Sequence, residues 1–356
     1  MRDLPYWVAL SKISSLGARR IMRLVEFFGS AKNAYLADTN ALYRTGLPEK
    51  VLRALIHERD KIDPYASERQ LADLGLQVVT FVQESYPFLL KQIYDPPAIL
   101  YYRGDMNVLN STCVAMVGSR KATEYGKTAA SKIAEGLAAA GVVVVSGMAR
   151  GIDTAAHLGA LRAGGKTVAV LGCGLDICYP PENIKLREKI ATSGLLLSEF
   201  PPGTQPKPAN FPMRNRIISG LSLATVVVEA AEKSGALITA DCALEQGRDV
   251  FAVPGSIHSP ASKGCHRLIK EGAAMVEDVT DILNAMGVEM AITKGNKEQI
   301  TVLQLLVLEA LEYEPIHFDD VCARSGLSAA QLASVLPELE LAGMLKKMPG
   351  NYYLRV

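Results

Sequence analysis

Between about residue 110 and residue 285, short apolar runs rich in valine and leucine alternate with longer stretches of helical periodicity. The predicted strands are Cys113–Val117, Val142–Val145, Thr167–Leu171, Leu195–Leu197, Ala224–Val228 and Val250–Val253. The predicted helices between them are Tyr125–Ala139, Asp153–Ala163, Ile184–Ala191 and Leu237–Gln246. Strands that are apolar on both faces and are joined through helices form parallel sheets covered on both sides. This pattern predicts an α/β domain with a Rossmann-like, doubly wound sheet.

The residues before this region have a different pattern. Residues 1–75 contain short amphipathic helices, and Ile13 to Ile21 indicates a helix, a tight turn at Gly17 and a second helix. This is the form of a SAM-like or helix-hairpin-helix domain, whose turn amides can contact a phosphate. A plain pair of antiparallel helices fits the same residues. Residues 76–110 read as extended chain that adds one or two strands to the sheet.

The residues after this region predict a third domain. A polar stretch at 293–299 is typical of a linker. It is followed by three predicted helices, Ile300–Leu311, Phe318–Gly326 and Ala329–Ala342, and by a hairpin over 344–356. Three helices followed by a hairpin indicate a winged-helix-like domain. The expected domains are therefore 1–75, 76–290 and 300–356.

Composition and charge exclude several classes. The net charge of +1 excludes a globally basic nucleic-acid binder, so any affinity for DNA must come from local patches. The six cysteines are scattered without a CxxC pair or zinc-ligand spacing, so no metal site is expected. No apolar run approaches the ~20 residues that span a bilayer, and the N-terminus lacks a signal core. We therefore expect a cytoplasmic protein that does not contact membranes.

Glycine-rich turns connect several predicted strands to the helices that follow them. After the first strand come Gly118, Ser119, Arg120 and Thr123, and after the second come Ser146 and Gly147. Glycine allows close approach of the backbone, a helix N-terminus attracts anions, and arginine can bind a phosphate through two N–H groups. The carboxyl ends of neighbouring parallel strands share one edge of the sheet. The pattern predicts an edge that binds a polyanion or a nucleotide.

Two further segments add cations, an aromatic ring and another turn. Lys207 and Phe211 precede a helix that begins with two arginines, and cations interleaved with a stacking ring suit single-stranded nucleic acid. A solvated basic face is the plainer interpretation. The candidate DNA-binding residues are Gly118, Ser119, Arg120, Thr123, Tyr125, Gly126, Ser146, Gly147, Lys207, Phe211, Arg214, Asn215, Arg216, Ser234 and Gly235.

The same loops lack the signatures of common enzymes. The first loop is neither the GxGxxG fingerprint nor a Walker A loop, so neither NAD nor ATP is supported. No nucleophile and base stand at a recognisable spacing. We expect no catalytic residues and no cofactor.

Six motifs resemble those of one family. GSRKATEYG (118–126), SGMARGID (146–153), GCGLDICYPPEN (172–183), SEFPPGTQP (198–206), FPMRNRIISGLS (211–222) and SGALITA (234–240) are similar to the DNA-processing protein A family, DprA/Smf. The resemblance covers essentially the whole central domain. It implies a recombination mediator that binds and protects single-stranded DNA and loads RecA onto it during natural transformation. It also implies flanking SAM-like and winged-helix-like domains.

The resemblance assigns roles to particular residues. Gly118, Ser119 and Arg120 would hold a DNA phosphate, and Lys207 and Phe211 would meet the backbone and a base. Some relatives carry the lysine one residue later, where this chain has Pro208, so the role of Lys207 stays open. The resemblance also implies a homodimer through the Rossmann-like domain, for which an apolar face including Leu268, Ile269 and Met275 is the candidate.

Two alternatives come from other classes. The LOG-type nucleotide hydrolases look related and carry a PGGxGT loop, where this chain has Lys233, Ser234 and Gly235. Glu229 and Glu232 would be the candidate acids, but no partner is apparent for general acid–base work. A scaffold that binds only proteins, with the glycine loops serving as turns, is the other alternative.

Overall fold

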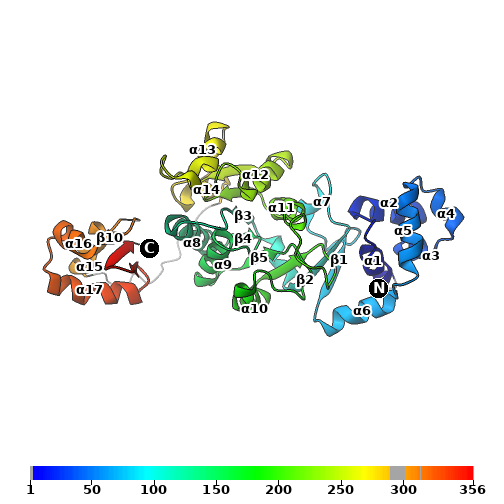
Figure 1. Ribbon diagram of the computed structural model, residues 1–356, viewed down its shortest axis with the longest axis horizontal. Helices are drawn as coiled ribbons and strands as arrows, with labels where there is room; N and C mark the ends of the chain where they lie inside the picture. The colour runs from blue at the N-terminus through cyan, green and yellow to red at the C-terminus, as the bar shows by residue number, and fades with distance from the viewer. Residues whose placement is uncertain (1–2, 289–300, 313, 356) are drawn as a thin grey trace.

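The centre of the molecule is a twisted sheet that positions every candidate loop (Figure 1). The computed structural model describes residues 3–288, 301–312 and 314–355, and the predicted linker at 293–299 lies outside these ranges. Within them the main sheet has nine strands in the order β1-β2-β6-β5-β4-β3-β7-β8-β9.

The parallel part of the sheet confirms the predicted doubly wound α/β fold. Its strands are β3 (Cys113–Val117), β4 (Val143–Ser146), β5 (Thr167–Val170), β6 (Leu195–Ser198), β7 (Ala224–Val227), β8 (Asp249–Ala252) and β9 (Ala274–Met275). Residues 76–110 add β1 (Gln77–Thr80) and β2 (Ile99–Gly104) beyond β6, where β2 pairs antiparallel with β6 and β1 pairs antiparallel with β2. The predicted strands agree with the observed ones to within one or two residues.

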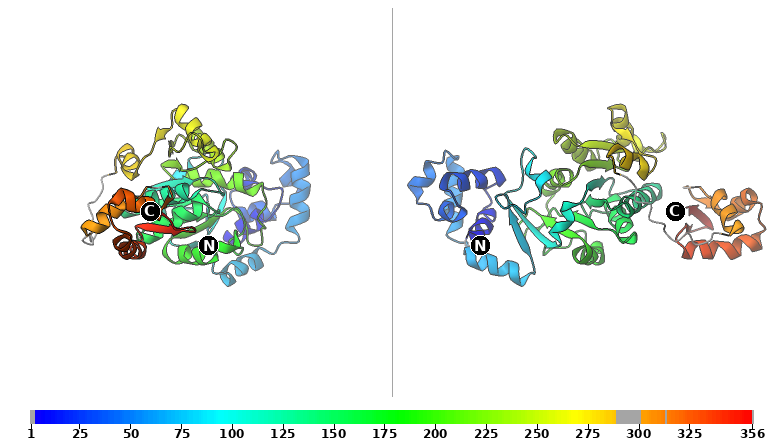
Figure 2. Two further views of the ribbon diagram at one scale, coloured as in Figure 1. Left: turned by 60° about the vertical axis from the view of Figure 1, so that its left-hand side comes forward. Right: turned by 180° about the vertical axis from the view of Figure 1, so that it is seen from behind.

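Helices cover both faces of this sheet because successive side chains of each strand point in opposite directions. Val114 and Met116 pack against α8 (Glu124–Ala139), α9 (Ile152–Arg162) and α14 (Val279–Ala285). Ala115 and Val117 belong to the cluster formed with α11 (Asn210–Gly220), α12 (Gly235–Glu245) and α13 (Lys263–Lys270). The other helices of this region are α7 (Phe88–Lys91) and α10 (Ile184–Ser193). The result is a three-layer sandwich (Figure 2).

The N-terminal helices pack directly on the sheet. They are α1 (Leu4–Ser11), α2 (Ala18–Phe28), α3 (Ala31–Leu36), α4 (Thr39–Tyr43), α5 (Glu49–Arg59) and α6 (Pro64–Asp73). One apolar cluster extends from Trp7 and Leu10 to Tyr101 of β2, whose hydroxyl lies 2.6 Å from that of Ser11. The predicted helical character of residues 1–75 is confirmed. The boundary at residue 75 stays a prediction, since the core is continuous there.

The C-terminal residues form the predicted winged helix. Its elements are α15 (Val302–Ala310), β10 (Ile316–His317), α16 (Phe318–Ser325), α17 (Ala329–Leu341), β11 (Leu345–Met348) and β12 (Tyr352–Arg355). Capping boxes start α15 at Thr301 and α17 at Ser328, where each hydroxyl and a glutamine three residues later satisfy the first amides. The strands form a small sheet in the order β10-β12-β11. The two-residue β10 is too short to be predicted from an alternating pattern.

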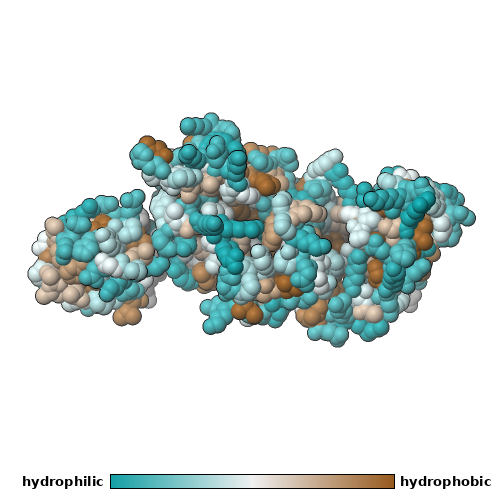
Figure 3. All heavy atoms as spheres, in the orientation of Figure 1, coloured by the Kyte–Doolittle hydropathy of each residue, from teal (hydrophilic) through white to brown (hydrophobic). Residues whose placement is uncertain are grey.

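The surface is mainly hydrophilic in the view of Figure 3, with scattered apolar patches. Among the described residues, no helix combines the length and apolar character needed to cross a bilayer. The predicted dimer face is corrected in one respect. Leu268 is only 3% exposed and belongs to the core, whereas Met275 is 48% exposed and Ile269 is half-buried. Only part of that face is therefore available to another chain.

Candidate functional site

A cleft opens where the chain reverses its direction of travel through the sheet. After β3 the chain adds β4, β5 and β6 on one side, and it then returns to place β7 on the other side of β3. The loops that follow β3 and β7 diverge at such a point, and ligands of open α/β sheets bind in the crevice between them. A cleft of about 700 Å³ lies there, lined by the loop 118–121, the start of α12 and residues of α11.

Three exposed cations line this cleft. Arg120 and Lys121 come from the loop after β3, and Lys233 comes from the loop after β7. Within the described ranges these side chains form no hydrogen bond or ion pair with the protein. Asp153 is the one carboxylate among the described residues that line the cleft, and it is buried at the inner end. The cleft therefore presents positive charge that the described residues do not neutralise.

An aromatic ring stands beside these cations. Phe211, at the start of α11, is half-buried and lines the cleft. The Arg120 guanidinium lies 4.8 Å from the centroid of its ring, within cation–π distance. On another side the Tyr179 ring lies 5.6 Å away at a tilt of 38°. A ring supported in this way can stack with a base while a phosphate meets the guanidinium.

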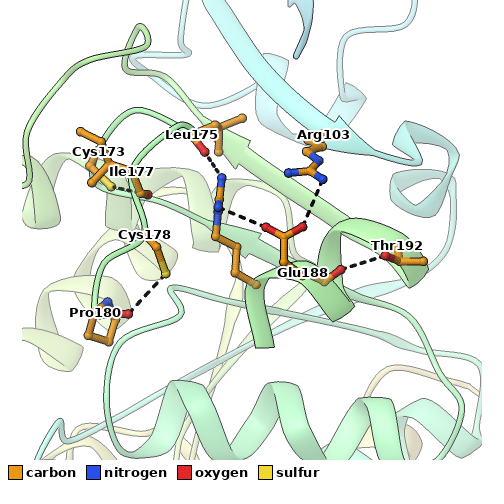
Figure 4. Close-up of polar contacts among 9 residues, drawn as sticks. Arg103, Cys173, Leu175, Ile177, Cys178, Pro180, Glu188 and Thr192 are labelled. Atoms are coloured by element: carbon orange, nitrogen blue, oxygen red, sulfur yellow. Dashed lines mark hydrogen bonds and ion pairs between the residues drawn. The ribbon is translucent and has the colours of Figure 1, made fainter. Parts of the chain in front are cut away.

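The loop that carries Tyr179 is held in place by the network in Figure 4. Arg187 donates to the carbonyl of Leu175 and, over 3.2 Å, to Glu188, which also pairs with Arg103 of β2. Burial raises the pKa of Cys173 to about 11, so this thiol is protonated at neutral pH. The loop is a rigid support, and its cysteine is a packing residue.

The N-terminus of α12 faces the same cleft. The Ser234 hydroxyl caps this helix by accepting a hydrogen bond of 3.3 Å from the amide of Ala236. Gly235 is exposed at the first turn, and its carbonyl accepts a hydrogen bond from the Asn215 side chain. The partial positive charge of a helix N-terminus adds to that of Lys233. Ser234, Gly235 and Asn215 thus lie together at the cleft, with Asn215 supporting the turn.

Arg214 lies at the floor of the cleft and is a structural residue, which corrects its predicted role as a direct phosphate ligand. It is 3% exposed, and it donates to the carbonyls of Gly147, over 2.7 Å, and Val170. Burial lowers its pKa to about 10, although Asp153 opposes the shift. A Cβ on Gly147 would lie 2.5 Å from the guanidinium. The glycine at 147 therefore makes room for Arg214, and its predicted approach to a phosphate is also corrected.

Four more predicted ligands are occupied within the protein. Thr123 donates to the buried Glu229 carboxylate through its amide and its hydroxyl, each over 2.8 Å. The Tyr125 hydroxyl donates to the carbonyl of Pro254, and that of Ser146 to the carbonyl of Met116. Gly126 is buried against Glu229. Since each hydroxyl has a single hydrogen, which the protein already uses, Thr123, Tyr125 and Ser146 are corrected to structural roles. Gly126 is corrected likewise, because it is packed against Glu229.

Gly118 and Ser119 do line the cleft, but for a different reason than expected. A Cβ on Gly118 would lie 2.5 Å from the Ile152 side chain, so tight packing requires glycine there. The Ser119 amide donates to the carbonyl of Glu229 over 2.7 Å, and the Ser119 hydroxyl accepts from the amide of Lys121. The hydroxyl can still donate to a ligand. The loop therefore offers side chains to a ligand, among them the Ser119 hydroxyl.

Two predicted cations lie outside the cleft. Arg216 is paired with Asp95, over 3.2 Å, and with Glu199. Lys207 is exposed on the preceding loop and is not among the residues that line the cleft. The prediction for Arg216 is wrong because its charge is already neutralised. The role of Lys207 stays a prediction.

Sequence reasoning did not select Lys121, Lys233 or Tyr179. The signal for the two lysines was present, since each stands in a glycine-rich turn shortly before a helix. Tyr179 had no such signal, because its contact with Phe211 joins residues that are 32 positions apart in the sequence.

Comparisons with known proteins give consistent matches. The model of the DNA recombination-mediator protein A family matches residues 77–287, and that of the DprA winged helix domain matches residues 296–351. The chain is 35% identical over 390 residues to Protein Smf from Synechocystis sp., covering 98% of each protein.

Two solved structures are also similar. DNA processing protein A from Streptococcus pneumoniae superimposes with a TM-score of 0.69 at 38% identity, covering 78% of this chain and 95% of that one. DNA processing protein A from Helicobacter pylori superimposes with a TM-score of 0.54 at 32% identity, and the match covers 59% of this chain and 95% of that one. The single-stranded DNA binding mode of that protein has been described.

Proposed function

The chain belongs to the DNA recombination-mediator protein A family, and from this premise we propose that its cleft binds single-stranded DNA. The observation that carries the proposal is that Arg120, Lys121 and Lys233, none of which is ion-paired within the described residues, line one cleft together with the ring of Phe211. The single-stranded DNA binding mode of the Helicobacter pylori relative supports the same class of ligand.

The combination of cations and ring favours an unpaired strand. Cations follow the phosphates of any nucleic acid, but a ring can stack only on a base whose face is free. Stacking is insensitive to sequence because every base has a π-face. We therefore expect the protein to prefer single strands to duplexes and to discriminate little between sequences.

Titration of labelled strands tests this proposal directly. Fluorescence anisotropy is measured with a single strand and with a duplex of equal length at one salt concentration. We expect the single strand to bind well above the duplex. Equal affinity for the two would contradict the proposal, because charge alone would then account for binding.

Phe211→Ala isolates the stacking contribution. Loss of a stacked base is expected to weaken single-strand binding by roughly 1–3 kcal/mol and to leave the slope of log K against log salt unchanged. Phe88→Ala is the matched control, because Phe88 is an exposed ring that lines a different pocket, away from this cleft. A fall in melting temperature for Phe211→Ala without a specific loss of affinity would indicate that the ring is only a packing residue.

We further propose that binding proceeds without chemistry on the DNA. Glu229, the candidate acid of the nucleotide-hydrolase alternative, accepts two hydrogen bonds from Thr123 and is buried beneath the loop. It is therefore occupied as a structural acceptor. Incubation with AMP, ATP or DNA is expected to yield no product above background, and turnover that Glu229→Gln abolishes would revive the alternative.

The winged helix is expected to be dispensable for this binding. Residues 301–356 contain four Lys and Arg against seven Asp and Glu, a net charge of −3. In helix-turn-helix proteins the recognition helix enters the groove of DNA, but the corresponding α17 carries Glu338 and Glu340 and no basic residue. An acidic surface repels phosphates, so this domain is a poor candidate for the DNA site.

Deletion of residues 289–356 tests that expectation. The remaining chain should keep its single-strand affinity within a few-fold, as measured by the same anisotropy titration. Circular dichroism reports whether the truncated protein is folded. A truncated protein that is folded but no longer binds would move the site into the winged helix.

The recombination-mediator family also supports two protein partners. We propose that the protein loads RecA onto the strand it holds and that it acts as a homodimer through the central domain, where Ile257 and Met275 are exposed. RecA filaments should form faster on single strands coated with a single-strand-binding protein when the protein described here is added. Sedimentation at micromolar concentration should show a dimer, and a monomer alone would argue against the second partner.

A further inference from the structure

A second groove borders the cleft on the other side of Pro212. Its volume is about 630 Å³, and it lies between the start of α2 and the helices α11 and α12. Pro212 lines both the cleft and this groove, and Met213 follows it on the groove side. A chain molecule that leaves the cleft across Pro212 therefore enters the second groove directly.

The groove holds an aromatic ring that the fold does not bury. Tyr94 is 87% exposed, although large aromatic side chains are normally buried for most of their area. The Arg19 guanidinium lies 3.7 Å from its centroid and donates to the Tyr94 carbonyl over 3.2 Å. This pairing repeats that of Arg120 with Phe211 in the cleft, again with a cation over one ring.

The charges in the groove are unevenly placed. Arg19 and Arg20 are exposed on the α2 side, where Arg20 donates to the carbonyl of Ser15. Arg216 also lines the groove, but Asp95 and Glu199 neutralise it. Glu245 is exposed on the α12 side. A polyanion that passes through this groove would be attracted by the α2 wall and repelled by Glu245.

We propose that a single strand held in the cleft continues over Pro212 into this groove, where a base stacks on Tyr94 and Arg19 neutralises a phosphate. The inference rests on the proposed function of the cleft and extends the DNA path onto the N-terminal helices. The sequence of residues 13–21 indicates a turn whose amides can contact a phosphate. In this proposal the side chain of Arg19 makes that contact.

The test compares two lengths of oligothymidine on the full-length protein. A strand of about five nucleotides occupies only the cleft, whereas one of about twenty nucleotides reaches both the cleft and the second groove. These lengths are in keeping with site sizes of about 4–16 nucleotides in single-strand binding folds. Tyr94→Ala is expected to weaken binding of the long strand on the order of tenfold and to leave the short strand unaffected. Arg19→Ala should also make the slope of log K against log salt flatter by about 0.7 for the long strand.

Two controls separate a DNA contact from a structural role. Tyr43→Ala removes an exposed ring of α4 outside the groove and should change neither affinity. Glu245→Gln removes the repulsive charge and should strengthen binding of the long strand alone, which the loss of a packing contact would not do.

The outcomes distinguish this inference from the proposed function. If the unsubstituted protein binds neither strand, the function of the cleft fails and the inference fails with it. If the short strand binds normally and the long strand is unaffected by Tyr94→Ala and Arg19→Ala, only the second groove is refuted. An equal loss of affinity for the short and the long strand would also refute it, because Tyr94 and Arg19 would then affect binding by stabilising the fold and not by contacting the DNA.

Discussion

Replacing Arg120, Lys121 and Lys233 together with alanine is expected to reduce single-strand affinity by roughly two orders of magnitude near physiological salt. Each cation that neutralises a phosphate releases counterions, so the slope of log K against log salt changes by about 0.7 per contact on single strands. Three contacts correspond to a slope that is flatter by about 2. Because all three side chains are exposed and form no hydrogen bond or ion pair within the described residues, folding should be little affected.

A matched triple variant shows whether position or net charge is responsible. Lys32, Lys185 and Lys189 are also exposed, and their replacement by alanine removes the same charge away from the cleft. We expect the control to bind almost as the parent does. A control that loses as much affinity and slope as the cleft variant would mean that the DNA senses only the overall charge.

Arg214→Met is expected to produce the largest loss of stability among the candidate residues. Arg214 is buried, where it donates to the carbonyls of Gly147 and Val170, and its positive charge opposes the rise that burial causes in the pKa of Asp153. Removing one member of a buried charged group leaves the other uncompensated, which destabilises proteins by about 3–5 kcal/mol. Methionine is long enough to fill part of the space but cannot donate to the carbonyls.

Urea unfolding monitored by circular dichroism measures this effect. Arg120→Met is the matched control, since it makes the same substitution at an exposed position of the same cleft. It should lose DNA affinity while its unfolding midpoint stays close to that of the parent. If Arg214→Met unfolded like the parent and lost only affinity, Arg214 would be a direct ligand after all.

The sheet could be predicted closely because its strands are buried on both faces. Runs such as Cys113–Val117 and Ala224–Val227 are buried throughout and, apart from Thr225, apolar, and the helices between them have clear periodicity. The two-residue strands β9 and β10 could not be predicted, since pairing with a neighbour defines them more than their own residues do. The continuity of the core between α1 and β2 also depends on contacts that no local pattern encodes.

The site was predictable only as a set of loops. Turn motifs indicate where a strand ends and a helix begins, but not which donors the protein itself occupies. Thr123 bonds to Glu229, which lies 106 residues away, and Arg214 bonds to Gly147, which lies 67 residues away. Such long-range partners turned several predicted ligands into structural residues. Arg120 is exposed and forms no hydrogen bond within the described residues, and both it and the half-buried Phe211 line the cleft.

Photo-cross-linking locates the bound strand most directly. A single strand that carries 5-iodouracil is irradiated with the full-length protein, and the modified peptides are identified by mass spectrometry. The cleft between the loops after β3 and β7 predicts that the main cross-link falls on the peptide containing Phe211, and that it is lost when Arg120, Lys121 and Lys233 are replaced. Cross-links confined to residues 301–355, unchanged by those substitutions, would contradict the assignment of the DNA site to the cleft.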